Sequence, residues 1–272
     1  MVWKLFFYHT IGLLIIIDKN SDASIINMLY NEYSKVDKTT FKKYLLNRIK
    51  ELYFSEKKTT PFSKFDEEQI RTDLEELSVQ NSDKVRMVLL LYNIALLVNA
   101  YNTYEIFPFE LFKKGTWDIE HINPQTPREA TEEEKKNWLL SYKMIINDSN
   151  ILNEIDKCIS CKFENFAAVS EKISEELNII DNDSISNLVL LDASTNRGYK
   201  NECFSEKRRK IIEVERTKCN DEKYIPIGTK WVFLKGYDKA NQLVVWAADD
   251  MKEYVEDIAA KIFSLLEGNI NG

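Results

Sequence analysis

The stretch GTWDIEHI, residues 115–122, combines β-leaning side chains with an acid next to a histidine. Its aromatic and β-branched residues predict a short strand. Pro124 and Pro127 follow closely and predict that this strand runs into a loop. The chain has only 2 histidines, and one of them, His121, comes directly after Glu120 at the end of the predicted strand. This pair is therefore the first candidate for chemistry.

A second strand of similar character is predicted at residues 185–191, ISNLVLL. A turn-rich stretch from Asp192 to Gly198 follows it, and the basic segment 204–216 then predicts a helix. Strand, loop and helix thus follow one another in order. The long connection between the two strands is predicted to be helical, because Thr131 and Glu134 form a capping-box pattern.

Most of the remaining chain is predicted to be helical. Only 7 Gly and 5 Pro in 272 residues disfavour turn-dense sandwiches and Gly-rich phosphate loops. The run 84–101 has apolar residues on almost every face, which predicts a buried helix. Further helices are predicted to start at Ser24 or Ser21, at Thr39 or Thr40, at Asp66 and, for the buried helix itself, at Ser82 or Asp83, with another over 163–177.

The C-terminal part predicts a β-hairpin followed by a helix. Residues 230–234 and 242–246 are apolar and flank the polar stretch 236–241, which is the pattern of two paired strands and a turn. Asp249 or Asp250 is then suited to cap a final helix. Taken with the two strands above, these patterns predict an α+β protein that is mostly helical.

The charge balance argues against indiscriminate binding of nucleic acid. With 37 Lys plus Arg against 44 Asp plus Glu the formal net charge is -7, so the chain as a whole repels phosphates. Residues 196–218 depart from this balance, because they hold eight basic and four acidic residues. Phosphate contact is therefore expected in this local patch, although an isolated charge run is more often a solvated helix face.

Cysteine usage and hydropathy indicate the cellular setting. Four cysteines without a regular framework are typical of reduced thiols in a cytoplasmic protein. The apolar run 2–17 contains Lys4 and His9 and is shorter than the ~20 apolar residues that span a bilayer. We therefore expect a buried segment, with His9 as a satisfied core residue, and no membrane association. Because the chain begins so hydrophobic, we also expect it to be the later part of a longer architecture.

An adjacent acid and histidine suit the hydrolysis of a phosphodiester. The reaction needs a base that activates water and a divalent cation that neutralises charge, and His121 and Glu120 can serve these needs separately. Because side chains alternate along a strand, a twist or bulge is expected to bring the two together. Such a pair alone is more often a surface dipeptide. The nine-residue spacing of Asn187 and Asn196, around the second strand and its loop, favours the functional interpretation.

The combination resembles the HNH, or His-Me finger, nucleases. The matching blocks are Glu120-His121-Ile122 with Pro124-Gln125, then Asn187-Leu188-Val189-Leu190, then Asn196-Arg197-Gly198 before a helix. It is more similar still to the nuclease half of Gmr-type modification-dependent restriction enzymes, in which a WDIEHI segment follows a Phe-Pro-Phe stretch, as it does within residues 107–122 here. Asn201, Phe204, Lys207 and Arg208 fit the pattern that closes that family's domain.

This resemblance implies the architecture of the chain and a role for each matching residue. A ββα-metal (His-Me finger) core would occupy residues 107–224 with a helical insertion at 128–180, between an N-terminal helical region (1–106) and the hairpin and helix (225–272). His121 would be the general base, and Asn187 would hold strand and loop together through backbone hydrogen bonds. Glu120 and Asn196 would hold one Mg²⁺ or Mn²⁺. The residues implied to contact nucleic acid are Arg197, Lys200, Asn201, Lys207 and Arg208.

The implied function is that of a metal-dependent endonuclease that cuts DNA in prokaryotic anti-phage restriction, with an NTP-dependent sensor domain or subunit outside this chain. One alternative is a toxin nuclease that acts on RNA or single strands, because the chemistry recognises a phosphodiester and not a base. The other is a non-catalytic nucleic-acid-binding or scaffold subunit. We expect no structural zinc, because Cys158, Cys161, Cys203 and Cys219 include only one closely spaced pair.

Overall fold

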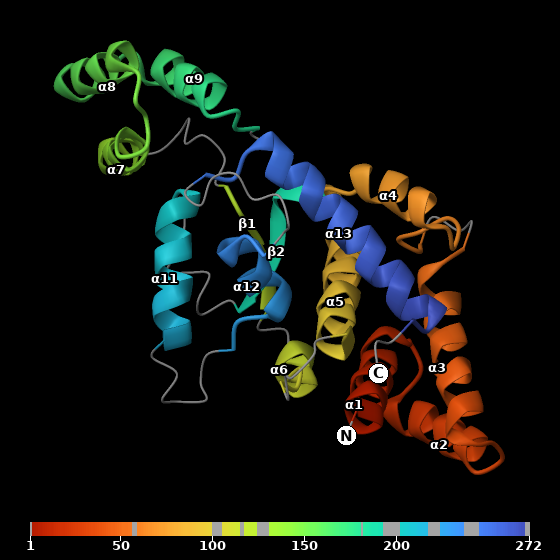
Figure 1. Cartoon of the computed structure of the whole chain (residues 1–272). Helices are drawn as coiled ribbons and strands as arrows, with labels where there is room; N and C mark the ends of the chain where they lie inside the picture. The colour runs from red at the N-terminus through yellow and green to blue at the C-terminus, as the bar shows by residue number, and fades with distance from the viewer. Residues whose placement is uncertain are drawn as a thin grey trace.

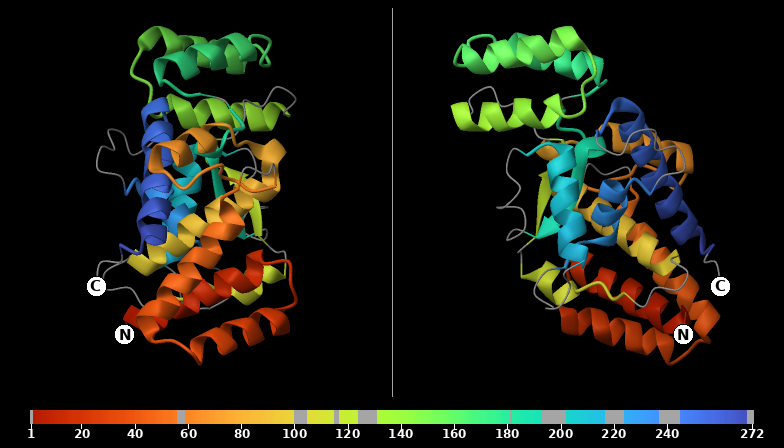
Figure 2. Two further views of the ribbon diagram at one scale, coloured as in Figure 1. Left: turned by 90° about the vertical axis from the view of Figure 1, so that its right-hand side faces the viewer. Right: turned by 60° about the vertical axis from the view of Figure 1, so that its left-hand side comes forward.

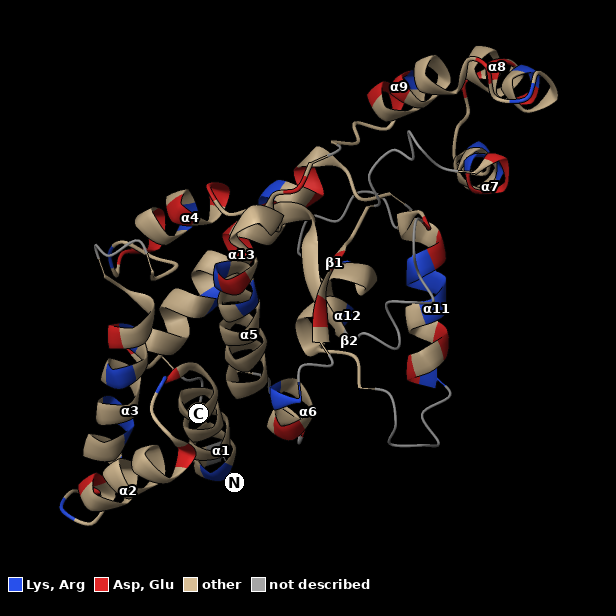
Figure 3. Ribbon diagram, turned by 180° about the vertical axis from the view of Figure 1, so that it is seen from behind, with Lys and Arg blue, Asp and Glu red and all other residues tan. Residues whose placement is uncertain are grey.

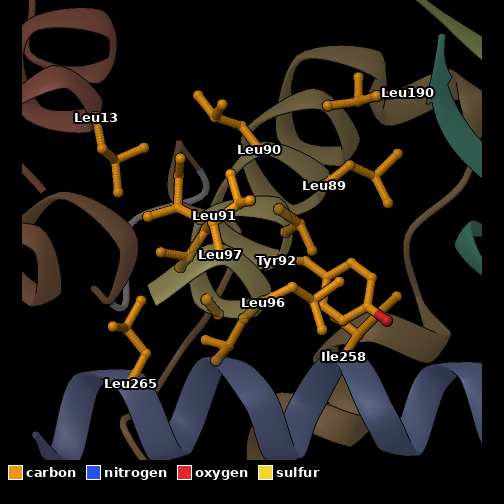
Figure 4. Packing of buried hydrophobic residues seen from close by; sticks show 14 of the residues in the cluster. Leu13, Leu89, Leu90, Leu91, Tyr92, Leu96, Leu97, Leu190, Ile258 and Leu265 are labelled. Carbon is orange, nitrogen blue, oxygen red and sulfur yellow. The ribbon is translucent and has the colours of Figure 1, made fainter. Parts of the chain in front are cut away.

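Helix α5 (Ser82–Asn99) is the central element of the structure, because its side chains are apolar around most of its circumference. Val85 and every residue from 88 to 98 are buried. In the computed structural model, α5 packs against helix α1 (Val2–Ile17), helix α13 (Ala248–Glu267) and strand β2 (Leu188–Asp192), with its leucines between them (Figure 4). The prediction of a buried helix in this part of the chain is confirmed.

The structure describes residues 2–55, 59–99, 105–114, 117–123, 131–180, 182–192, 202–216, 224–236 and 245–269. These residues form a mostly helical fold with a two-stranded antiparallel sheet, which confirms the predicted α+β class (Figure 1). The remaining elements are α2 (Asp22–Tyr33), α3 (Lys38–Tyr53), α4 (Glu67–Glu75), η1 (Val79–Asn81), α6 (Phe109–Lys113), β1 (Trp117–His121), α7 (Glu132–Lys143), α8 (Ser149–Ser160), α9 (Phe166–Glu176), η2 (Ile185–Asn187), α11 (Phe204–Arg216) and α12 (Ile227–Leu234).

Side-chain caps set the starts of the N-terminal helices α2, α3 and α4. Ser21, Asp37 and Asp66 each accept a hydrogen bond from the backbone N–H three residues further on. Such a cap satisfies one of the N–H groups that lack a partner in the first turn. The caps predicted at Ser21 and Asp66 are confirmed. A cap at Thr39 or Thr40 is wrong, because Asp37 caps α3 and Thr40 supplies the N–H that it accepts.

Helix α1 is part of the core, as its apolar sequence predicts. Among the described residues no helix is both long enough and apolar enough to cross a bilayer. His9 of α1 is fully buried. Its Nδ1 donates to the carbonyl oxygen of Leu5 at 2.9 Å, and its Nε2 accepts from the backbone N–H of Phe107 at 3.2 Å. Both ring nitrogens are thus satisfied by groups that require a neutral imidazole.

This burial makes the free energy of unfolding depend on pH. Burial lowers the pKa of His9 from 6.5 to about 4, against the opposing effect of its hydrogen bond to Leu5. The folded state therefore binds fewer protons than the unfolded state between these values, and stability falls as the pH drops through this window. The full loss is about 3 kcal/mol. Urea unfolding at pH 7, 5.5 and 4.5 should show a steeper dependence for the wild type than for His9→Gln, and equal slopes would contradict this account.

Strands β1 and β2 pair antiparallel, with Trp117 opposite Asp192 and His121 opposite Leu188. The register is regular along the whole pair, so the bulge expected to bring Glu120 and His121 together is a wrong prediction, and their side chains point to opposite sides of the strand. β2 begins later than predicted, because residues 185–187 form the 3₁₀ turn η2. On its other edge β2 is held by side chains, since the Tyr254 hydroxyl donates to the Leu188 carbonyl at 3.1 Å. The small sheet is thereby anchored to α13.

The C-terminal β-hairpin is a wrong prediction. Residues 227–234 form the helix α12, which starts after Pro226 and ends at Lys235 in a left-handed conformation (φ 53°). A short apolar run fits a buried helix as well as a strand, and here Val232 and Phe233 are buried in the core. Residues 237–244 lie outside the described part. The final helix is confirmed as α13, but it begins earlier than predicted: Ala247 is its N-cap, and Asp250 lies in its first turn, where its side chain accepts from the N–H of Ala247 at 2.9 Å.

Helices α7, α8 and α9 surround a separate hydrophobic core. Their buried side chains include Trp138, Tyr142, Ile155 and Phe166. The predicted capping box opens α7, because Thr131 and Glu134 bond each other's backbone N–H groups. Figure 2 shows α8 and α9 at one end of the molecule with α7 between them and the main body, and Cys203, just before α11, completes this second core. The connection between β1 and β2 therefore forms a small helical unit with its own core, while the sheet itself belongs to the main core.

Candidate functional site

The candidate site lies at the carboxyl end of β1, where Glu120 and His121 are adjacent. Their side chains contact different elements, as alternation along a strand requires. The Glu120 carboxylate pairs with Lys207 of α11, and the His121 ring contacts Asp183 in the segment before η2. The antiparallel partner β2 and the helix α11 therefore approach this strand end from two sides (Figure 3).

Lys207 is held in the interior beneath this strand end. Its side chain has no exposed surface, and its Nζ donates to Glu120 Oε1 and to the His121 carbonyl oxygen, both at 2.6 Å. Burial lowers the pKa of Lys207, while the nearby Glu120 carboxylate opposes that shift. The ammonium thus links α11 to both residues of the pair. A lysine placed in this way does not reach a phosphate at the surface, which is the role that the resemblance implies for it.

Helical spacing explains why Lys207 points inward. The buried residues of α11 are Phe204, Lys207 and Ile211, which are spaced i, i+3 and i+7 and share one face of the helix. Phe204 stacks on Phe233 with a centroid distance of 5.3 Å. Lys207 therefore occupies a core-facing position between two hydrophobic residues, and its charge is satisfied by Glu120.

Basic and acidic residues alternate along α11 (Figure 3), and two of its other basic residues are paired with acids of the same region. Arg209 contacts Glu206 at 3.0 Å and Glu213 at 3.7 Å, and Lys210 contacts Glu202 at 2.5 Å. These pairs are partly exposed and reduce the positive charge that the helix offers to a phosphate. Arg208 is half-buried and makes no ion pair with any described residue. Among the residues predicted to contact nucleic acid, it is the described one whose charge is not matched by a described acid.

Asn187 connects the loop after β1 to the segment before β2. It is fully buried. Its Oδ1 accepts from the backbone N–H of Asn123 at 2.8 Å, and its Nδ2 donates to the carbonyl oxygens of Asn123 and Asn182, each at 3.0 Å. Asn123 in turn donates from its Nδ2 to the Trp246 carbonyl at 2.6 Å. A single amide thus satisfies the backbone of two segments that lie far apart in the sequence.

This arrangement predicts a large effect of Asn187→Asp. The carboxylate cannot donate to the two carbonyl oxygens, and its charge would be buried against them. We expect the free energy of unfolding to fall by about 3 kcal/mol, measured by urea denaturation. Asn182→Asp is the matched control, because the Asn182 Oδ1 accepts from Ser184 and an aspartate preserves that role. Equal losses in the two variants would contradict the account.

Asp183 is a site residue that the sequence analysis missed. Its Oδ1 lies 2.9 Å from His121 Nε2, and the side chains of the pair are 35% and 27% exposed, respectively. Its own backbone is fixed, since its carbonyl accepts from the N–H of Val79 at 3.0 Å, and Ser184 forms a β-bridge with Ser78. A separation of 62 residues from His121 leaves no local signal by which spacing could identify it.

Four predicted site residues, Asn196, Arg197, Lys200 and Asn201, lie outside the described residues. The described part contains no cluster of three or more His, Cys, Asp or Glu side chains that would hold a metal ion. Glu120 offers the hard oxygen donor that Mg²⁺ and Mn²⁺ prefer, and the ammonium of Lys207 shows that this carboxylate already has a cation beside it. The donor type of Glu120 fits a divalent cation, although its Oε1 is already paired with the Lys207 ammonium.

Comparison with protein families gives one match. The family model described as GmrSD restriction endonucleases, C-terminal domain, matches residues 19–231. The matched region is well over half of the chain and includes β1, β2 and α11. No curated protein and no solved structure matches.

Proposed function

The chain belongs to the GmrSD restriction endonuclease C-terminal domain family, and we propose that it is a metal-dependent HNH endonuclease that hydrolyses DNA phosphodiester bonds at the end of β1. Its nuclease character follows from the family. The observation that most supports the HNH subtype is the convergence of β1, β2 and α11 on Glu120 and His121. That convergence is the arrangement expected of a ββα-metal core.

His121 is proposed to be the general base. It takes a proton from a water molecule, whose oxygen attacks phosphorus while the bond to the leaving oxygen breaks. The partial exposure of the His121 side chain suits this role, because water and a DNA backbone can approach the ring. Asn187 supports the reaction indirectly, since it fixes the loop that follows His121 through the backbone of Asn123.

Glu120 and Asn196 are proposed to hold one Mg²⁺ or Mn²⁺. When bound, the cation would stabilise negative charge on the phosphate and on the leaving oxygen. Lys207 keeps the Glu120 side chain in place through a buried ion pair and so presents a carboxylate of fixed orientation. Arg208 contacts the phosphate backbone in this proposal, together with Arg197, Lys200 and Asn201.

The biological setting is also part of the proposal. The family's printed description names restriction endonucleases, which supports a role in prokaryotic anti-phage defence in the cytoplasm. A C-terminal domain implies another part of the enzyme, and we propose that target choice resides in an NTP-dependent sensor domain or subunit that partners this chain.

The test is cleavage of supercoiled plasmid DNA, unmodified and carrying modified cytosine, with Mg²⁺, Mn²⁺ or a chelator. We expect nicking or linearisation that requires the metal and is lost in His121→Ala. Asp118→Asn is the matched control, because Asp118 lies on the same strand with a half-exposed side chain and should cleave normally. Cleavage of RNA, without cleavage of either the unmodified or the modified plasmid, would favour the toxin alternative. Cleavage in the presence of chelator would contradict metal dependence.

A further inference from the structure

The contact between His121 and Asp183 defines which atom of the histidine can accept a proton. An ionised carboxylate can only accept hydrogen bonds. At 2.9 Å from Asp183 Oδ1, His121 Nε2 must therefore carry the ring hydrogen and donate it. The neutral ring then has its lone pair on Nδ1, which is the only ring atom left to act as a base.

We propose that Asp183 is the positioning residue of the nuclease site, which holds His121 as the Nε2–H tautomer so that Nδ1 takes the proton from water. This inference rests on the proposed function. In the reaction an O–H bond of water breaks and an Nδ1–H bond forms, while the Nε2 hydrogen stays shared with Asp183. The positive charge that develops on the ring is stabilised by the adjacent carboxylate, which does not itself become protonated.

Asp183 orients the His121 ring, and Lys207 holds the His121 backbone. The Lys207 ammonium donates to the His121 carbonyl oxygen at 2.6 Å, which fixes the point from which the side chain starts. Asp183 fixes the far end of the side chain at Nε2. With both ends held, the direction of the Nδ1 lone pair is determined by the segment before η2 and by α11, whose contacting residues lie 62 and 86 residues from His121 in the sequence.

Asp183 is itself held in position by its neighbours. Its carbonyl accepts from Val79, and the carbonyl of the preceding Asn182 accepts from Asn187 at 3.0 Å. Asn187 also binds the loop after His121 through Asn123. The acid and the histidine therefore belong to one hydrogen-bonded unit, which suits a residue whose task is to set an orientation.

The second histidine of the chain provides an internal reference for a test. His9 donates from Nδ1 to a carbonyl oxygen and accepts at Nε2 from an N–H, so it is the opposite tautomer. Nitrogen-15 NMR of the intact protein, labelled at histidine and recorded at pH 8, above the ordinary histidine pKa of about 6.5, reports the protonated nitrogen of each ring. We expect His121 to carry hydrogen on Nε2, with a protected ring N–H signal that disappears in Asp183→Ala, while the His9 signals stay unchanged.

Cleavage kinetics give a second, independent measurement. Asp183→Asn should lower kcat by about 10- to 100-fold with little change in KM, and Asp183→Glu should recover part of the loss. A His121 ring that is protonated on Nδ1, or ring signals that do not respond to Asp183→Ala, would overturn the proposal. The NMR measurement does not depend on cleavage activity. If the spectra are as expected but the protein does not cleave DNA, the proposed function is rejected, while the hydrogen bond between His121 and Asp183 stands.

Discussion

Replacing His121 with alanine is expected to lower the single-turnover rate of metal-dependent DNA cleavage by about 10²–10⁴-fold. The loss arises because the variant has no group at the end of β1 that accepts the proton of the attacking water. Its fold should be retained, since the His121 side chain is 27% exposed and a substitution of this kind typically changes stability by less than about 1 kcal/mol.

The measurement is the rate of plasmid nicking with enzyme in excess and saturating Mg²⁺, together with urea unfolding of the same preparations. Unfolding shows whether a loss of cleavage reflects chemistry or a loss of folded protein. The Asp118→Asn variant of the same strand serves as the control and should match the wild type in both measurements. A His121→Ala protein that cleaves at the wild-type rate would remove the histidine from the mechanism.

Replacing Lys207 with methionine is expected to lower the free energy of unfolding by about 3–5 kcal/mol. Methionine preserves much of the volume, so the effect does not come chiefly from a cavity. It comes from the Glu120 carboxylate, whose side chain is 12% exposed and which would lose its ionic partner. The His121 carbonyl would lose a hydrogen bond as well.

A double variant separates the lost ion pair from a general disturbance of the core. Lys207→Met combined with Glu120→Gln leaves no unpaired charge and should recover more than half of the lost stability in urea unfolding. Lys210→Met is the matched control on the same helix, because the Lys210–Glu202 pair is about one-third exposed, and it should cost less than about 1 kcal/mol. If Lys207→Met and Lys210→Met lower the free energy of unfolding by similar amounts, burial does not make the Lys207–Glu120 pair more important to stability than the exposed pair.

Local patterns predict the elements that carry the site. β1 follows from alternating β-leaning residues next to turn-forming prolines, and α11 begins and ends where its sequence predicts, at Phe204 and Arg216. Both signals lie within the element itself, so no knowledge of distant contacts is needed. The same holds for the capping box of α7.

Predictions fail where distant contacts decide. Residues 230–234 have strand-like composition, yet they lie in helix α12, which packs against α5 and β2. Lys207 looks like part of a basic patch, although its spacing from Phe204 and Ile211 places it on the buried face of α11. That spacing is a usable signal. The acid that contacts His121, by contrast, is brought there by the fold across a 62-residue separation, and a single sequence carries no pattern for it.

In the proposed mechanism, His121 at the end of β1 accepts a proton during metal-dependent cleavage of DNA. The most direct test of this role is chemical rescue of His121→Gly by added imidazole, measured as the rate of plasmid nicking with Mg²⁺. We predict that imidazole restores cleavage to His121→Gly in proportion to its concentration and restores none to Glu120→Gln. A His121→Gly protein that nicks plasmid at the wild-type rate without imidazole would contradict the claim.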